Sequence, residues 1–251
     1  MKVKIPKPLH GWRAFSGEVG IVLLGVFLAL SAEQVVDALN WRQKIGVAER
    51  SMRIELSQDD APQAYARMII APCLEARLNQ VIDGLGKIPP DQLRTWTHTY
   101  APPFRTWDSE AWKVALASDV GSHMGPERLI AWSLPYRMMD SLNARNAREA
   151  DLAIELNEAL PPSGSPTADE LKRTRGLAAT LRVINRAMRN GSQLLLSRTR
   201  SVGADVSAFD QHGMIKEARA IYGGCAQVPN LNARPQAQSF ESSLRGHAPI
   251  K

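Results

Sequence analysis

The stretch Val19-Gly-Ile-Val-Leu-Leu-Gly-Val-Phe-Leu-Ala-Leu30 decides the fold of this 251-residue chain. As a helix rising about 1.5 Å per residue, these 12 residues cover about 18 Å, less than the roughly 30 Å of a bilayer's hydrocarbon core. The flanking residues, from position 14 to position 32, extend the span to 19 residues, which is long enough to cross. The sequence therefore predicts one transmembrane helix, which we place at residues 14–34.

Four cations stand before the apolar stretch and orient it. Lys2, Lys4, Lys7 and Arg13 all precede it, and the positive-inside rule places such a basic segment in the cytoplasm. We therefore expect a cytoplasmic tail at residues 1–13, with everything from residue 35 onward outside the cytoplasm.

Two other interpretations of this segment stay open. A cleaved secretory signal also has a basic start and a short apolar region, and Ala29-Leu-Ser31 fits a small-x-small cleavage site. A buried helix of a water-soluble domain can also contain 12 apolar residues. We favour the uncleaved anchor because Glu18 interrupts the junction of basic and apolar parts and the helical pattern continues past the cleavage site.

One face of the anchor carries an acid and a row of small residues. Glu18, Gly25, Ala29 and Ala32 are spaced by seven, four and three positions, so they share a helix face. Small residues let membrane helices approach closely, and a carboxylate at that depth favours a polar partner. This pattern predicts contact with a second copy of the chain or with another membrane protein. The alternative is that Glu18 reaches the lipid headgroups and the small residues have no such role.

The same residues resemble a known pattern. The pattern consists of Gly17-Glu18-Val19, Val22, Gly25 and Ala29-Leu30, with Trp41 further on. It is similar to the N-terminal anchor of uncharacterised bacterial single-pass membrane proteins that carry a domain of unknown function. The match covers about 30 of the 251 residues, and Trp41 stands several positions later than its counterpart. The resemblance implies the inner membrane of a Gram-negative bacterium and no particular activity.

The rest of the chain favours one all-α domain. Alanine, leucine and arginine are abundant and β-branched runs are scarce. We expect an extracytoplasmic helical domain at 35–228, which begins with a stalk helix at 35–58, and a flexible tail at 229–251. The two cysteines, Cys73 and Cys225, both follow the anchor, and in an oxidising compartment they are expected to form a disulfide.

Helix boundaries are indicated by prolines and caps. The sequence predicts that Asp59-Asp60-Ala-Pro62 slows or ends the stalk helix and that Ala71-Pro72 breaks the chain again. Asp108 is expected to cap a short helix at 109–118, and Thr167 with Glu170 forms a capping box. The predicted longer helices, each with its inward residues where these are indicated, are 73–85 (Leu74, Leu78, Val81, Leu85), 127–160 (Leu129, Trp132, Tyr136, Met139), 167–202 (Leu171, Ala178, Leu181, Met188, Leu195) and 207–222.

The net charge of +6 is concentrated between Pro166 and Val202, a stretch that contains eight basic and two acidic residues. The cations are Lys172, Arg173, Arg175, Arg182, Arg186, Arg189, Arg198 and Arg200. Outside the cytoplasm we expect no nucleic-acid partner, so anionic lipid or an acidic protein remains. The simpler interpretation is that acids at positions 149, 151, 155 and 158 pair with these cations across a helical hairpin.

Catalytic and metal-binding motifs are not evident. Asp119, Ser122 and His123 are close in sequence, but a triad is assembled in space and no Gly-x-Ser-x-Gly elbow accompanies them. We expect no catalytic residue, metal or cofactor. The aromatic section from Trp96 to Trp112 either fills the core or binds sugar rings of the cell wall.

Three functions follow as hypotheses. The leading one is a membrane-anchored interaction or scaffold protein without enzymatic activity. The alternative is a ligand-binding helical bundle that signals through a membrane partner. An enzyme acting on cell wall or lipid is the third, with the aromatic section as its only support.

Overall fold

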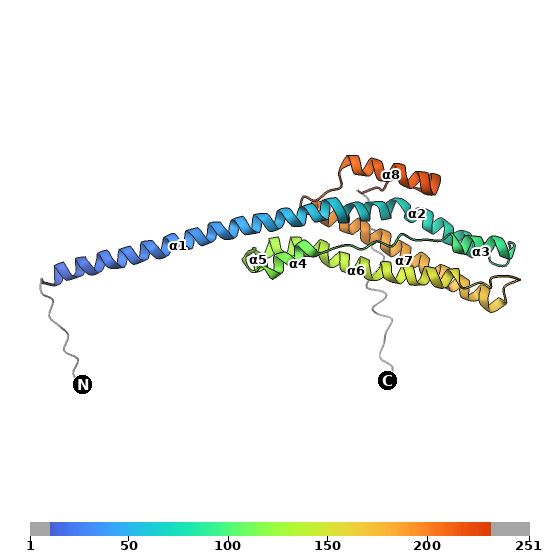
Figure 1. The fold of residues 1–251 in the computed structure, drawn as a ribbon, viewed down its shortest axis with the longest axis horizontal. Coiled ribbons are helices and arrows are strands. Elements are labelled where there is room, and N and C mark those ends of the chain that lie inside the picture. Colours follow the sequence, from blue (N-terminus) through green and yellow to red (C-terminus); the bar gives the residue numbers. More distant parts are fainter. Residues whose placement is uncertain (1–10, 232–251) are drawn as a thin grey trace, which may run out of the picture. The chain divides into compact units, whose positions relative to one another are not determined.

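The computed structural model describes residues 11–231, and every regular element in that range is a helix (Figure 1). The elements are α1 (Gly11–Glu55), a π-helical turn (Leu56–Asp60), α2 (Ala61–Gly84), α3 (Pro90–His98), α4 (Glu110–Ala117), α5 (Val120–His123), α6 (Pro126–Asn157), α7 (Ala168–Ser201), α8 (Ala208–Tyr222) and a 3₁₀ turn (Gly223–Cys225). The all-α prediction is confirmed for this range. Internal contacts divide the chain into two units, which meet between Glu49 and Arg50.

The first unit contains most of α1, and its apolar side chains are exposed. Ile21 is 73% exposed and Phe27 is 67% exposed. None of the 18 residues in its most apolar window is buried, and the helix is long and apolar enough to cross a membrane. The predicted cytoplasmic cations Lys2, Lys4 and Lys7, and the predicted tail beyond residue 231, lie outside the described residues.

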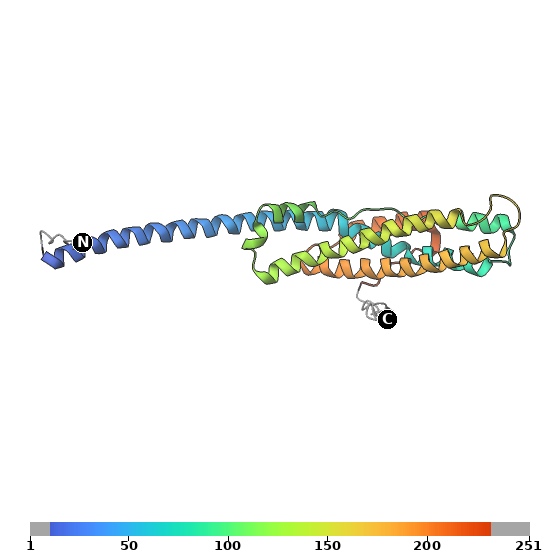
Figure 2. The ribbon, with the colours of Figure 1, turned by 90° about the horizontal axis from the view of Figure 1, so that it is seen from below.

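The core of the second unit is formed by α2, α6 and α7. Helix α7 packs against both α2 and α6, and Figure 2 shows α6 and α7 running antiparallel. The buried side chains that the sequence predicted are Leu74, Leu78, Val81 and Leu85 near α2, Trp132, Tyr136 and Met139 on α6, and Ala178, Leu181, Met188 and Leu195 on α7. Leu129 and Leu171, also predicted to be inward, are only half-buried. Apolar contact between three long helices therefore supplies most of the folding energy, at about 1.5–3 kcal/mol for each fully buried large side chain.

Two predicted helix breaks are absent. Instead of ending near Asp59, the helical path widens into the π-turn and continues as α2, with Pro62 in the first turn, where an N–H group is not needed. Pro72 lies inside α2. Its neighbours Ala71 and Cys73 are buried, so packing offsets the hydrogen bond that the proline removes. The predicted break at Ala71-Pro72 is therefore wrong.

One predicted cap is confirmed and one is wrong. Thr167 Oγ1 accepts from the Glu170 N–H at 3.3 Å, and Glu170 Oε2 accepts from the Thr167 N–H at 2.7 Å, which makes the predicted capping box of α7. Helix α4 begins at Glu110, and Ser109 rather than Asp108 stands at its N-cap. The Asp108 N–H donates to Asp60 Oδ1 at 3.1 Å.

Arg186 of α7 pairs with an acid of α2 rather than of α6. Arg186 Nε donates to Glu75 Oε1 of α2 at 2.7 Å. Glu155, expected to reach across to α7, lies 3.7 Å from Arg148 of its own helix. Glu149 is buried and also binds α2. The predicted pairing across the α6–α7 hairpin is thus wrong for Arg186, Glu149 and Glu155. Arg186 and Glu149 each pair with a residue of α2, and Glu155 pairs within α6.

Helix α8 lies against α2 (Figure 1) and is fastened to it at its C-terminal end. Cys73 of α2 and Cys225 form a disulfide, with their Cα atoms 5.1 Å apart and 152 positions between them in sequence. Just beyond it, the Gln227 N–H donates to Ile69 O of α2 at 3.3 Å. The disulfide therefore adds a covalent link to the packing of α8 on α2.

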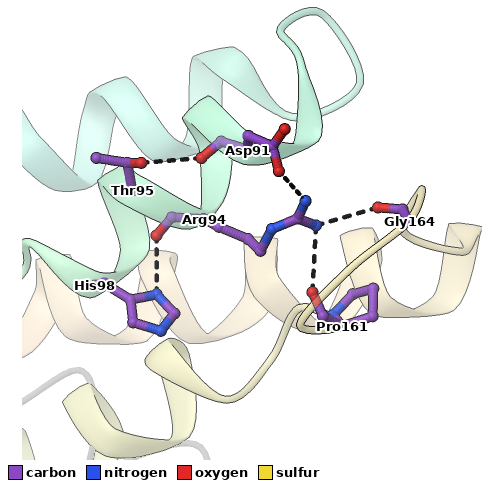
Figure 3. A network of polar contacts seen from close by, with 6 residues as sticks. All are labelled: Asp91, Arg94, Thr95, His98, Pro161 and Gly164. Carbon is purple, nitrogen blue, oxygen red and sulfur yellow. Dashed lines mark hydrogen bonds and ion pairs between the residues drawn. The ribbon is translucent and has the colours of Figure 1, made fainter.

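A cationic side chain holds the α6–α7 turn, as Figure 3 shows. Arg94 Nη1 of α3 donates to Pro161 O at 3.2 Å and to Gly164 O at 3.1 Å, and the guanidinium also pairs with Asp91. Gly164 has φ +80°, a left-handed conformation that favours glycine. His98 Nδ1 lies 2.9 Å from Arg94 O on the same helix. These contacts explain why a proline-rich turn takes one conformation against α3.

Candidate functional site

A buried ion pair joins α2 to α6. Arg67 Nη2 donates to Glu149 Oε1 at 2.7 Å, and the two side chains are 4% and 0% exposed. The same nitrogen donates to Asn185 Oδ1 of α7 at 2.9 Å. Because removing two charges from water costs several kcal/mol, such a pair needs short contacts and additional hydrogen bonds. One guanidinium therefore ties the three core helices together.

Two further contacts complete this network, which we call the Arg67 network (Arg67, Tyr100, Glu149 and Asn185). Tyr100 OH donates to Glu149 Oε1 at 3.0 Å. Burial, followed by the charge of Glu149, raises the pKa of Tyr100, so its hydroxyl stays protonated and remains a donor. Asn185 Nδ2 donates back to Ala71 O of α2 at 2.9 Å.

One face of α6 fastens the irregular segment 100–109. The side chains of Asn143, Asn146 and Glu149 follow one another at three-residue steps, so they project from one side of the helix. Asn143 accepts from the Trp107 N–H at 2.9 Å and donates to Trp107 O at 2.8 Å, and Asn146 donates to Arg105 O at 2.5 Å. Glu149 holds the first residue of the segment through the tyrosine hydroxyl. A segment without secondary structure is thereby positioned as firmly as a helix.

A cavity of about 300 Å³ lies where α2, the segment 100–109, α6 and α8 meet. Its walls from α2 and α8 each consist of residues three or four positions apart, so each helix presents a single face. The lining residues are Gln63, Ala66, Arg67 and Ile70 of α2, Pro103, Arg105 and Trp107 of the segment, Asn146 of α6, and Met214, Glu217, Ala218, Ile221 and Tyr222 of α8.

Several buried polar atoms among the lining residues have no hydrogen-bond partner. They are Nε and Nη1 of Arg67, Nε1 of Trp107 and Oε1 of Gln63. Arg67 is 4% exposed and Trp107 is 5% exposed. Other protein atoms cover these polar atoms, so each leaves an unmet hydrogen bond inside the fold at a cost of about 1–3 kcal/mol. The cavity, which is lined by residues of four segments of the chain, is the candidate functional site of the helical unit.

A second polar cluster surrounds the π-turn. Asp60 is fully buried and its Oδ1 accepts from the Asp108 N–H at 3.1 Å, while Glu55 Oε2 accepts from the Ala111 N–H at 2.8 Å. Burial, with the nearby charges of Glu55, Asp108 and Asp59, raises the pKa of Asp60 to about 8, although the hydrogen bond from Asp108 acts in the opposite direction. At neutral pH this side chain is accordingly protonated. The cluster fixes the other end of the segment 100–109.

The predicted membrane-contact residues all belong to α1. Glu18, Gly25, Ala29 and Ala32 are all exposed residues of the first unit. A Cβ atom added to Gly25 would meet nothing within 4 Å. The structure thus leaves this face available for contact within a bilayer, without identifying what covers it.

The aromatic section is mostly part of the core. Tyr100 and Trp107 are buried, and the ring of Trp112 stacks on Tyr136 of α6 at 5.5 Å between centroids. Phe104, by contrast, is 62% exposed. The interpretation that these aromatic residues fill the core therefore holds for Tyr100, Trp107 and Trp112, and not for Phe104.

The neighbours of His123 do not form a triad. Ser122 Oγ lies 3.0 Å from Nδ1 of His123, and the Asp119 carbonyl and carboxylate oxygens face the same ring nitrogen at 3.1 and 3.9 Å. In a triad, the nucleophile and the carboxylate contact opposite ring nitrogens. Among residues 11–231, no group of three or more His, Cys, Asp or Glu side chains is placed to hold a metal ion.

Sequence reasoning missed the most important members of the site, Arg67, Glu149 and Asn185. Each is a polar residue on the buried face of its helix. A polar residue at such a position needs a hydrogen-bond partner, but the sequence does not say which residue supplies it. No protein-family model, no curated protein and no solved structure matches this chain.

Loss of one partner of the buried pair should cost more stability than loss of both. We expect Arg67→Met to lower the free energy of unfolding by about 3–5 kcal/mol, because it leaves Glu149 buried and unpaired. The double variant Arg67→Met/Glu149→Leu should be no less stable than the single variant. Urea unfolding followed by circular dichroism measures both.

The control for this comparison is the half-exposed pair of Arg186 and Glu75, which joins α7 to the same helix, α2. Arg186→Met should cost less than about 1 kcal/mol, since exposed pairs contribute little. Additive losses in the Arg67 and Glu149 variants would contradict the description of these residues as one buried unit.

Asp60 should make stability fall as pH rises. The folded protein keeps the Asp60 proton up to about pH 8, whereas the unfolded chain releases it near the ordinary value of 3.8. Between these values folding takes up a proton, so this group lowers the free energy of unfolding by up to about 1.4 kcal/mol per pH unit of increase. Asp60→Asn should flatten the dependence between pH 5 and pH 8 in urea titrations. Asp59→Asn removes only the smallest of the contributions that raise the Asp60 pKa, so it should change the dependence much less than Asp60→Asn. Equal slopes for the wild type and both variants would refute the assignment.

Proposed function

We propose that this protein is a membrane-anchored interaction protein, with residues 14–34 spanning the bacterial inner membrane and the helical domain in the periplasm. The exposed apolar surface of α1 carries this proposal, since large side chains such as Ile21 and Phe27 need a lipid or protein environment. The basic residues before it orient the N-terminus toward the cytoplasm.

The disulfide supports the same orientation. Cytosolic thiols are kept reduced, whereas disulfides persist in oxidising compartments. Cys73 and Cys225 both belong to the second unit and lie at bonding distance, so that unit suits the periplasm.

The interaction is proposed to take place inside the bilayer, along the face of Glu18, Gly25, Ala29 and Ala32. Its partner is a second copy of the chain or another membrane protein, and nucleic acid is not a partner. Close approach of small residues and pairing of a buried carboxylate are the forces that associate helices in lipid. The protein performs no reaction in this proposal; it assembles with others.

A second candidate function is favoured by the cavity beside the Arg67 network. In that function the domain binds a small ligand and passes the signal to a membrane partner. The supporting observation is a cavity of about 300 Å³ that is lined by residues of α2, α6, α8 and the segment 100–109.

Substitutions on the proposed contact face should weaken assembly in the membrane. Gly25→Leu places a bulky side chain where helices approach, and Glu18→Leu removes the polar partner, so each should reduce cross-linked product in intact cells at least threefold. Gly20→Leu, on the opposite side of α1 and with equally open surroundings, is the matched control.

The helical domain should stay folded in all three variants, which non-reducing electrophoresis and protease resistance check. Cross-linking that is unchanged in both Gly25→Leu and Glu18→Leu, or reduced equally by Gly20→Leu, would rule out this face as the contact.

A further inference from the structure

We propose that Asp60 is a proton-dependent switch: while its carboxyl holds a proton, residues 108–111 stay closed over the π-turn, and loss of that proton to water releases them. We call these four residues, Asp108-Ser-Glu-Ala111, the strap. The proposal concerns a local response of the helical unit to pH, and it depends on neither of the two candidate functions.

Two acids of the helical path bind the two ends of the strap. Asp60 Oδ1 accepts from the Asp108 N–H at 3.1 Å, and Glu55 Oε2 accepts from the Ala111 N–H at 2.8 Å. Asp60 is the last residue of the π-turn and Glu55 is the last residue of α1. Single π-helical turns within longer helices are frequent at functional sites. The strap therefore covers the point at which the path from α1 to α2 widens.

The strap itself buries little surface. None of its four residues is buried, whereas Trp107 before it is only 5% exposed and Trp112 after it stacks on Tyr136. It is thus a short bridge between two tryptophans that pack in the core. Its hydrogen bonds to the two acids, rather than apolar contact, hold it in place, so it can lift without unfolding a helix.

The surroundings of Asp60 suit a neutral carboxyl and not a charged one. Its side chain is fully buried, and Oδ2 has no hydrogen-bond partner. The charged groups that act on it among residues 11–231 are Glu55, Asp59 and Asp108, which are all acidic. Tyr136 of α6 stays neutral because burial, followed by the charge of Glu55, raises its pKa. An ionised Asp60 would therefore be repelled by its neighbours and would lack a donor for one oxygen.

Water can solvate the ionised carboxylate only if part of its cover moves. The helical path on the C-terminal side of Asp60 is fixed, since Ala61, Ala64 and Tyr65 of α2 are buried in the core. On α4, the exposed pair of Lys113 and Glu110 is closed on itself at 2.7 Å and does not neutralise Asp60. The strap is the part of the cover with the least buried surface, so it is the part that opens.

The direction of the response follows from where the proton is held. In the closed form Asp60 keeps its proton up to about pH 8, whereas a solvated carboxyl releases it near the ordinary value of 3.8. Between these values opening releases one proton, so the ratio of open to closed strap should rise about tenfold per pH unit. Above about pH 8 both forms are ionised and the ratio should become constant.

Hydrogen exchange of the strap amides measures this ratio, because the N–H groups of Asp108 and Ala111 exchange only when their bonds to the acids open. The full-length protein in lipid nanodiscs is labelled between pH 5 and pH 9, and protection of peptide 106–112 is corrected for the intrinsic pH dependence of exchange. We expect protection to fall about tenfold per pH unit up to about pH 8 and then to level off.

Three variants identify the group that titrates. Asp60→Asn cannot ionise but keeps the acceptor oxygen, so its strap protection should be constant over this pH range. Glu55→Gln removes the largest charge contribution to the raised pKa of Asp60, so protection should level off at a lower pH. Asp59→Asn removes the smallest contribution and is the control, with a profile close to that of the wild type. A fall that persists unchanged in Asp60→Asn, or constant protection in the wild type, would overturn the proposal.

A fourth variant separates local opening from global unfolding. Leu181 is fully buried in α7, and Leu181→Ala should lower the protection of α7 amides at least tenfold by lowering global stability. Strap protection should be lower than that of α7 in the wild type and should stay the same in Leu181→Ala. Strap amides that match the α7 amides in both proteins would show that the strap opens only when the domain unfolds, which would also overturn the proposal.

Discussion

The ion pair of Arg67 and Glu149 is the contact on which the helical unit depends. Both charged side chains are buried, so neither charge is solvated by water. The fold must therefore keep α2 and α6 in register, since a slip of one turn would leave both charges unpaired at a cost of several kcal/mol. Asn185 of α7 and the hydroxyl of Tyr100 are recruited by the same two groups. Apolar packing makes the three helices associate, and the buried pair selects one arrangement among those that packing allows.

The chemistry of the cavity follows from this network. Arg67 also lines the cavity, so the residue that joins α2 to α6 is part of the cavity wall. Helix α8 closes the cavity with five lining residues, and its C-terminal end is held by the disulfide between Cys73 and Cys225. The disulfide and the packing of α8 on α2 together hold this wall of the cavity. The compartment that permits the disulfide is also the one in which the proposed ligand would be met.

Helices and the disulfide could be predicted from sequence because both depend on local or compositional signals. The capping box of Thr167 and Glu170, the inward face of α7 and the pairing of the only two cysteines are examples. The errors arose where tertiary contacts override local preference. Pro72 does not break α2 because its neighbours are buried against other helices. The partners of Glu149 and Arg186 depend on which helix lies beside which, and spacing along one helix carries no such information. The cavity is less predictable still, since its lining comes from four segments of the chain.

The central claim is that an anchored domain, shaped by its disulfide, lies outside the cytoplasm. The most direct test is the oxidation state of Cys73 and Cys225 in growing cells that express the full-length protein. Cells are treated with a membrane-permeant alkylating reagent before lysis, and the two peptides are examined by mass spectrometry with and without reduction. The account predicts that neither cysteine is alkylated until the protein is reduced, and that the two peptides remain linked. Complete alkylation of both cysteines without reduction would contradict the disulfide and, with it, the proposed periplasmic location.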